Sequence, residues 1–456
     1  MPNYLNPRHQ KRFMPKAKKG KPAAGAPQPG DMVRLICEGQ VYQGVFLPGA
    51  KNDDAFITLK MSSGYNIGVK RGRITSLELL EKGSSAIPGA RAEKEGEEPR
   101  QKGQVALLGC GGTIVNRIDY RTGAVYPATS PRELLAGIPA AAKFNVRART
   151  LFSIASEDMS IAHWQKMAEE AASEMKDGAE GVIITHGTDI MHYSSAALSF
   201  MLQNLSCPVI FTGSQRSSDR GSSDSETNVR SALIASRADL SGVFICMHEN
   251  LSDDSCLLHF GTRVRKMHTS RRDAFRSISC LPAARVFPET EKLEKISGRC
   301  LPRNAGAKLS LDTKMNTNVA MQYIYPGIRP DALSPLSKYD GVVLVGFGLG
   351  HLPVNLAGAK DSHSLLPAVK ELIASGIPVV FASQVIYGRV DMNVYTNQRA
   401  LLEAGVIGHM CDMTPETAYV KLMWVLGREK KMEKVKLLME SDIVGEITQR
   451  SEITDY

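Results

Sequence analysis

Short runs of apolar residues recur along most of the chain, and stretches with apolar positions at helical spacing separate them. Four runs between residues 103 and 315 have the composition of buried strands: 105–108, 182–184, 209–211 and 243–245. Helix-like stretches lie between these runs, for example at 160–175 and 228–237. Regular alternation of strand and helix predicts a mainly parallel, doubly wound α/β sheet.

A second unit with the same pattern begins near Asn316. Its apolar runs and helix-like stretches alternate in turn, with runs at 319–324, 342–345 and 379–382 and helices at 365–375 and 415–426. The fold class that we predict is therefore α/β, with two doubly wound domains at residues 103–315 and 316–456.

Residues 30–82 show a different pattern, in which short β-type runs are separated by turns rich in Gly, Asn and Asp. Four or five short strands with such turns predict a small all-β, barrel-like module. The module has no evident catalytic constellation, so we interpret it as an interaction module. Residues 83–102 are rich in Gly, Ser, Pro and Glu, which is typical of a linker.

Positive charge is concentrated at the N-terminus. The 456-residue chain has a net charge of +9, and residues 1–29 hold seven Lys or Arg side chains and no acidic residue. The remainder therefore carries only 9 − 7 = +2. A basic segment rich in Pro, Ala and Gly predicts a disordered tail. The tail is either simply solvated or binds RNA phosphates, and its charge does not establish nucleic-acid binding by the folded body.

The composition also indicates in which cellular compartment the protein resides. No run of 18 apolar residues is present, and residues 1–30 lack the apolar segment of a secretory signal, so we expect no membrane association. The eight cysteines form no CxxC pair. They are interpreted as reduced thiols of a cytoplasmic protein rather than as a metal site or a disulfide framework.

Two threonines follow predicted buried strands directly. Thr113 stands in Gly111-Gly112-Thr113-Ile114, and Thr188 and Asp189 end the segment 185–189. Active sites of open α/β sheets lie at the carboxyl ends of strands, and a hydroxyl nucleophile needs a base or relay beside it. The alternative is structural, because Thr113 would also suit a helix N-cap, and Thr188 or Asp189 could cap a helix at 191–202.

Four further residues are candidates for the same site. Lys266 could lower the cost of deprotonating Thr188 if it lies near Asp189, although a solvated surface lysine is the simpler interpretation. Tyr120, in a polar stretch that resembles a lid, could act as a relay partner for the nucleophile. Ser156 and Glu157 could bind the ammonium and carboxylate of an amino acid, or could belong to the cap of the helix at 160–175.

These segments resemble, in order and spacing, the paired threonine motifs and the lysine of L-asparaginases. The resemblance implies that Thr113 is the nucleophile that attacks a side-chain amide, and that Thr188, Asp189 and Lys266 form a supporting triad. It further implies that Tyr120 is a lid tyrosine and that Ser156 and Glu157 bind the substrate. Cys110, where asparaginases usually have threonine, is interpreted as a small buried neighbour, since it lacks the Gly-x-Cys-x-Gly elbow of thiol amidotransferases.

Longer motifs outside these segments narrow the resemblance to the D subunits of archaeal glutamyl-tRNA(Gln) amidotransferases, at 64–68, 119–125, 348–351, 387–395 and 446–451. This implies hydrolysis of glutamine, or asparagine, with release of ammonia. A partner, the E subunit of such an amidotransferase, is implied to bind Glu-tRNA(Gln) and to activate it with ATP and Mg²⁺, so that this chain itself holds no metal or other cofactor. A homodimeric core within a heterotetramer is expected.

Two other hypotheses remain open. A free-standing L-asparaginase or glutaminase of nitrogen metabolism would share the active site but would need no partner. A binding protein that kept the fold and bound RNA with its basic tail would hydrolyse no amide. The presence of the whole threonine, aspartate and lysine set argues against this hypothesis, because a site without catalytic activity has no physical need for it.

Overall fold

The structure, a computed structural model, describes residues 27–47, 55–61, 66–82, 102–118, 125–127, 130–218, 222–359 and 363–451. It divides into a small unit, residues 1–89 with 118–125, and a large unit, residues 90–117 with 126–456. The predicted basic tail at 1–29 and the linker at 83–102 lie almost wholly outside the described residues.

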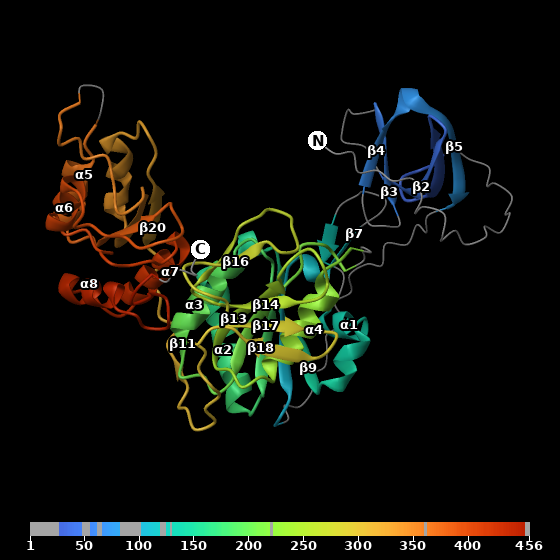
Figure 1. Cartoon of the computed structure of the whole chain (residues 1–456), viewed down its shortest axis with the longest axis horizontal. Coiled ribbons are helices and arrows are strands. Elements are labelled where there is room, and N and C mark those ends of the chain that lie inside the picture. The colour runs from blue at the N-terminus through green and yellow to red at the C-terminus, as the bar shows by residue number, and fades with distance from the viewer. Residues whose placement is uncertain are drawn as a thin grey trace. The chain divides into compact units, whose positions relative to one another are not determined.

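The small unit is a five-stranded antiparallel sheet (Figure 1). Its strands, in the order β4-β3-β2-β1-β5, are β1 Met32–Cys37, β2 Gln40–Leu47, β3 Phe56–Met61, β4 Asn66–Lys70 and β5 Ile74–Glu81. The edge strands β4 and β5 are joined by only the three residues of η2, Arg71–Arg73, so the sheet must curl to bring its edges together. The curl encloses a core that includes Leu35 and Leu59, and it confirms the predicted barrel-like module.

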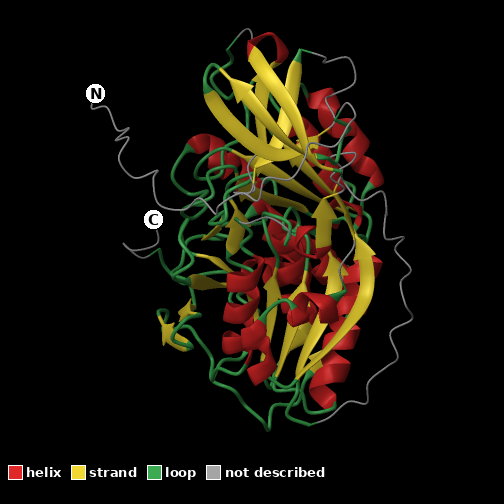
Figure 2. Ribbon diagram, turned by 90° about the vertical axis from the view of Figure 1, so that its right-hand side faces the viewer, coloured by secondary structure: helices red, strands yellow, loops and turns green. Residues whose placement is uncertain are grey.

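The large unit contains an eight-stranded sheet in the order β18-β17-β14-β13-β12-β10-β6-β9. Figure 2 shows strands flanked by helices. Five strands are parallel: β6 Val105–Gly111, β9 Val146–Ile154, β10 Gly181–Thr185, β12 Pro208–Thr212 and β13 Gly242–His248. Three antiparallel strands extend the sheet: β14 Cys256–Phe260, β17 Ala284–Phe287 and β18 Lys292–Lys295.

Helices cover both faces of this sheet, as a doubly wound fold requires. Alternate residues of β6 point to opposite faces, so that Leu108 packs with α2, Ile161–Lys176, and α3, Met191–Met201. Leu107 instead packs on the face covered by α1, Pro131–Ala136, and α4, Ser225–Ser236. The near-continuous apolar strands are thus explained, because a strand buried on both faces has no solvent side.

The C-terminal part repeats this arrangement on a smaller scale. Its parallel sheet has the order β20-β21-β22, formed by β20 Val319–Tyr323, β21 Gly341–Gly346 and β22 Val379–Ser383. The helices are α5 Leu366–Ala374, α6 Thr396–Glu403, α7 Pro415–Leu426 and α8 Met432–Glu440. One face of the sheet packs with α7 and α8, and the other with α5 and α6, so the predicted fold class is confirmed.

Short elements complete the described residues. There are further 3-10 helices, namely η3 Thr113–Val115, η4 Pro139–Lys143, η5 Ser156–Asp158 and η6 Pro330–Lys338. Three two-stranded sheets are also present, formed by β7 Asn116–Ile118 with β8 Val125–Pro127, β11 Leu202–Gln203 with β19 Ser310–Leu311, and β15 Val264–Lys266 with β16 Phe275–Ser277. None of the described helices has both the length and the apolar character needed to cross a membrane.

Candidate active site

Three neighbouring strands bring the predicted site residues to one edge of the large sheet. Strands β10, β6 and β9 are adjacent and parallel, so their carboxyl ends lie at the same edge. Thr113 follows β6, Thr188 follows β10, and Ser156 follows β9. Strand order therefore makes neighbours of three loops that are far apart in the sequence.

Two glycines hold the three loops in backbone contact. Gly112 has a φ of 88°, and a Cβ there would lie 2.4 Å from the Gly187 nitrogen. A Cβ on Gly187 would in turn lie 2.7 Å from the Ser156 Cβ. Side chains at either position would push the loops apart, so the glycines allow the close approach of the Thr113, Thr188 and Ser156 segments.

Thr113 is the first residue of the short helix η3. The preceding residue, Gly112, occupies the N-cap position, and no side chain caps the helix. Ile114 and Val115 are buried, which anchors the turn, whereas Thr113 is half-buried. The structural alternative, in which Thr113 caps a helix, is therefore not what the structure shows.

Lys266 joins the second threonine motif through its ammonium group. The Lys266 Nζ donates to the Thr188 Oγ1 at 2.8 Å and to the Asp189 Oδ1 at 2.7 Å. The Thr188 side chain is buried, only 10% of the Lys266 side chain is exposed, and Asp189 is 67% exposed. Helix α3 has Ile190 at its N-cap with no side-chain cap, so neither Thr188 nor Asp189 serves as its cap.

A β-hairpin places Lys266. In the pair β15–β16, Lys266 lies opposite Phe275, a fully buried residue, and the Met267 nitrogen donates to the Ala274 carbonyl oxygen at 2.7 Å. The buried partner holds the strand against the core, so that the lysine reaches Thr188 from a distant part of the chain. A three-residue strand has too little periodicity to be found in the sequence, and only the motif resemblance pointed to Lys266.

The predicted substrate-binding residues have different environments. Ser156 is buried in η5 and its Oγ lies 3.5 Å from the Glu157 Oε2, while Glu157 is exposed. Neither residue caps α2, because Ser160 forms that cap with His163. Tyr120 lies outside the described residues.

Two buried histidines that the sequence reasoning missed lie beside these groups. The His186 Nδ1 donates to the Gly187 carbonyl oxygen at 2.6 Å, and burial lowers the pKa of His186 to about 4. Burial, together with the positive charges of Arg265 and Lys266, lowers the pKa of His192 to about 3. Both rings are therefore neutral near pH 7. The only sequence feature that could have indicated His186 is its place within the segment 185–189, next to Thr188 and Asp189.

Cys110 is fully buried in the face of the sheet covered by α2 and α3. Burial raises the pKa of its thiol far above the ordinary value. A thiolate is the nucleophilic form of cysteine, so this environment disfavours a thiol mechanism. The described residues contain no cluster of His, Cys, Asp and Glu side chains that could bind a metal ion.

Three sequence families match successive parts of the chain. Residues 27–80 match the GatD N-terminal domain, residues 104–297 match Asparaginase, N-terminal, and residues 318–439 match the Glutaminase/Asparaginase C-terminal domain. The solved L-asparaginase of Thermococcus kodakarensis is similar with a TM-score of 0.67 and 32% identity, over 76% of this chain and 100% of that one.

Relatives that match almost the whole chain are more specific. The D subunit of glutamyl-tRNA(Gln) amidotransferase from Methanothermobacter thermautotrophicus is 44% identical over 435 residues, which are 94% of this chain and 95% of that protein. The protein of the same name from Pyrococcus furiosus is 42% identical, over 92% and 94% respectively. The small β unit, the two asparaginase-like parts and these relatives agree, and the chain belongs to the family of glutamyl-tRNA(Gln) amidotransferase D subunits.

Proposed function

We propose that this chain is the glutamine-hydrolysing, ammonia-donating subunit of the amidotransferase that converts Glu-tRNA(Gln) to Gln-tRNA(Gln). The observation that supports this most is the contact of Lys266 with Thr188 and Asp189, beside a loop that presents Thr113, in a chain of this family. The chain is an enzyme, and its chemistry is hydrolysis of a side-chain amide.

Thr113 is the proposed nucleophile. Its Oγ attacks the amide carbon of glutamine, a C–O bond forms, and the carbonyl oxygen becomes an oxyanion that backbone N–H groups stabilise. Collapse breaks the C–N bond, and the leaving nitrogen takes a proton and departs as ammonia. Water then attacks the acyl-threonine, which releases glutamate and restores the Thr113 hydroxyl.

Thr188, Asp189 and Lys266 form the proposed proton relay. The ammonium of Lys266 contacts the Thr188 Oγ1, and a positive charge at that distance favours the deprotonated hydroxyl. Asp189 holds the ammonium from the solvent side. In this scheme Thr188 accepts the proton of the nucleophile or of the attacking water and passes it to the leaving nitrogen.

Substrate binding falls to Ser156, Glu157 and Tyr120 in this proposal. The Ser156 hydroxyl is buried next to the exposed Glu157 carboxylate, a pair suited to the carboxylate and the ammonium of an amino acid. Tyr120, between β7 and β8, would cover the bound substrate. Glutamine is the proposed substrate, and asparagine the alternative one.

The use of the ammonia is proposed to involve a partner. The E subunit would bind Glu-tRNA(Gln), activate its glutamate with ATP and Mg²⁺, and receive the ammonia, with two copies of each protein in a cytoplasmic heterotetramer built on a homodimer of this chain. The name of the relatives, which are subunits of an amidotransferase, supports a complex of this kind.

A free-standing asparaginase is the second candidate, and the similarity to the solved L-asparaginase over 76% of the chain favours it. The small β unit and the relatives that match almost the whole chain favour the amidotransferase. Co-purification with the E subunit, followed by measurement of ammonia release with and without Glu-tRNA(Gln), separates the two candidates.

Strong stimulation of ammonia release by the aminoacylated tRNA is expected for the amidotransferase. A rate of ammonia release that is the same with and without the E subunit and the tRNA would identify the free-standing enzyme. Uncharged tRNA is the matched control, since it has the same phosphates without the glutamate.

A further inference from the structure

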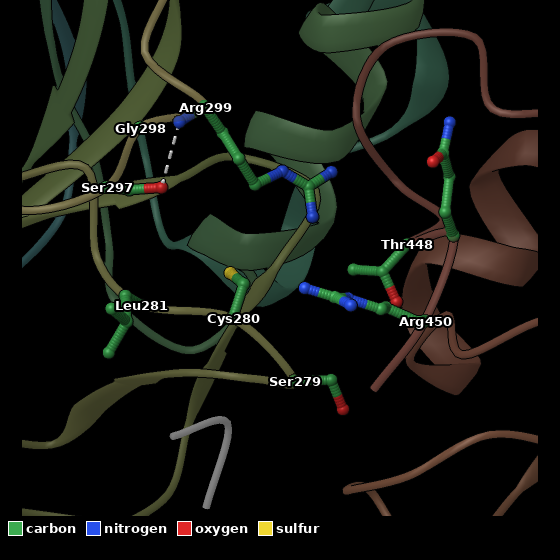
Figure 3. Close-up of a pocket in the computed structure, with 9 residues that line it drawn as sticks. Ser279, Cys280, Leu281, Ser297, Gly298, Arg299, Thr448 and Arg450 are labelled. Carbon is green, nitrogen blue, oxygen red and sulfur yellow. Dashed lines mark hydrogen bonds between the residues drawn. The ribbon is translucent and has the colours of Figure 1, made fainter. Parts of the chain in front are cut away.

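A cavity of about 360 Å³ lies in the large unit (Figure 3). Three segments line it, namely residues 279–281 between β16 and β17, residues 297–299 after β18, and residues 448–450 near the end of the described chain. It contains none of the residues proposed for catalysis or glutamine binding. Its volume is within the range of small-molecule sites, roughly 300–1,000 Å³.

Two arginines face this cavity without an acidic partner among the described residues. Figure 3 shows the guanidinium groups of Arg299 and Arg450 pointing into the same space from opposite segments. The Arg299 Nη2 donates to the Gly445 carbonyl oxygen at 3.1 Å, which is a neutral acceptor. Both arginines are exposed, and their positive charges would attract an anion that enters the cavity.

Two buried acidic residues close to the segment 448–450 are already engaged elsewhere. Asp412 accepts from Arg263 at 2.8 Å and from the Thr448 hydroxyl. Glu446 pairs with Lys421 at 2.5 Å and accepts from backbone nitrogens of its own segment. These buried ion pairs hold the C-terminal segment in place, with Arg450 in the lining of the cavity and with Asp412 and Glu446 bound to other groups.

Two serine hydroxyls of the cavity accept hydrogen bonds from backbone nitrogens. The Ser279 Oγ accepts from the Gly388 nitrogen at 3.2 Å, and the Ser297 Oγ accepts from the Arg299 nitrogen at 3.2 Å. Each oxygen therefore has its hydrogen available to donate. Ser279 is buried and has a φ of 52°, a conformation that costs free energy for a residue other than glycine.

We propose that this cavity is a binding site for the phosphate group of a small molecule. Two forked guanidinium groups match phosphate oxygens in geometry, and their combined charge of +2 matches a phosphomonoester better than a single carboxylate or phosphodiester. Ser279 and Ser297 supply additional donors. The site is distinct from the threonine site, and the proposal goes beyond glutamine hydrolysis.

Isothermal titration of the full-length protein with inorganic phosphate at low ionic strength tests the site. We expect Arg450→Gln and Arg299→Gln each to weaken binding by about tenfold or more, the effect of losing a charge-assisted hydrogen bond. Arg329→Gln is the matched control, because it removes an equal charge from an exposed arginine on a different segment. Binding that is absent in the wild type, or equal in wild type and both pocket variants, overturns the proposal.

Three further measurements identify the source of the phosphate and separate this proposal from the enzymatic one. Ammonia release by Arg450→Gln should equal that of the wild type, since Arg450 is outside the threonine site. Arg450→Lys keeps the charge without the fork and should bind phosphate more weakly than the wild type. If uncharged tRNA loses affinity in Arg450→Gln while inorganic phosphate never binds, the cavity is a nucleic-acid contact and the small-molecule proposal is wrong.

Discussion

Lys266 and Lys421 are two largely buried lysines of the large unit, and they use their charge in opposite ways. Lys421, on α7, is fully buried and donates to the carbonyl oxygens of Met439 and Ser441 at 3.0 and 2.5 Å. It pairs with Glu446, which is equally buried, at 2.5 Å. Its three donors thus have three fixed acceptors, all from the protein.

The contacts of Lys266 are a hydroxyl and a carboxylate that is mostly exposed. This lysine therefore stands between the core and the solvent, at the edge of the sheet where three loops meet. A closed network such as that of Lys421 serves stability, whereas a network that ends in a reactive hydroxyl and in solvent can exchange protons with a substrate.

The largest expected effect concerns the nucleophile that this network would serve. Thr113→Ala removes the proposed attacking oxygen, so glutamine hydrolysis should fall at least about a thousandfold. Far-UV circular dichroism and the free energy of unfolding should stay near the wild type. Thr113→Ser is the control and should keep measurable activity, and ammonia release by Thr113→Ala at the wild-type rate would exclude this mechanism.

A matched pair of substitutions tests the two lysines directly. Lys266→Met should lower kcat by about a hundredfold or more, with little change in the free energy of unfolding, because Asp189 can be solvated. Lys421→Met should leave Glu446 buried without its counter-charge and cost about 3–5 kcal/mol. Urea unfolding and an ammonia assay measure both effects, and equal destabilisation by the two variants would contradict the comparison.

The close approach of the loops gives a third test. Gly112→Ala would place a Cβ 2.4 Å from the Gly187 nitrogen, so the Thr113 and Thr188 segments should separate and kcat/KM should fall by about a hundredfold. Gly376→Ala is the control, since it has a similar φ of 81° with nothing within 4 Å of the added Cβ. It should cost only about 1 kcal/mol of stability. Activity losses of equal size would show that backbone strain, rather than loop contact, matters.

The smallest expected effect concerns the two buried histidines near the lysine site. Their pKa values in the folded state, about 4 for His186 and about 3 for His192, lie below the unfolded value near 6.5. At pH values between the folded and the unfolded pKa, the unfolded chain therefore binds more protons than the folded chain. The free energy of unfolding should fall as pH drops below about 6.5, by up to about 1.4 kcal/mol per pH unit for each histidine.

His192→Gln removes one of these groups and should make that decline shallower. Chemical unfolding at a series of pH values between 4 and 7 measures the slope. An unchanged slope in the variant would show that other groups cause the acid sensitivity.

Much of the fold follows from local pattern. The apolar run at 105–108 became β6, and the helix expected at 415–426 is α7 with the same limits. The antiparallel extension β14-β17-β18 and the hairpin that holds Lys266 were not predicted. Their strands are short and gain stability from pairing with distant segments, so their own sequences contain little signal.

The candidate site was predicted in part by chemistry and in part by resemblance. The structure removes the capping alternatives for Thr113, Thr188 and Asp189, because Gly112 and Ile190 occupy those cap positions. No local pattern marked His186 or His192 as neutral buried groups. Their protonation depends on burial, which is a property of the packed chain rather than of neighbouring residues.

Local sequence pattern is sufficient to predict which segments become buried strands, where glycines permit tight turns, and which hydroxyls and charges lie at strand ends. The contact of Lys266 with Thr188, 78 residues away, and the shared cavity of Arg299 and Arg450 are evident only in the folded chain. Hydrophobic periodicity and turn preferences act between near neighbours in the chain, so they can be found in the sequence. Contacts across the sheet depend instead on strand order and on the closing of long loops, which many sequences of similar pattern could satisfy differently.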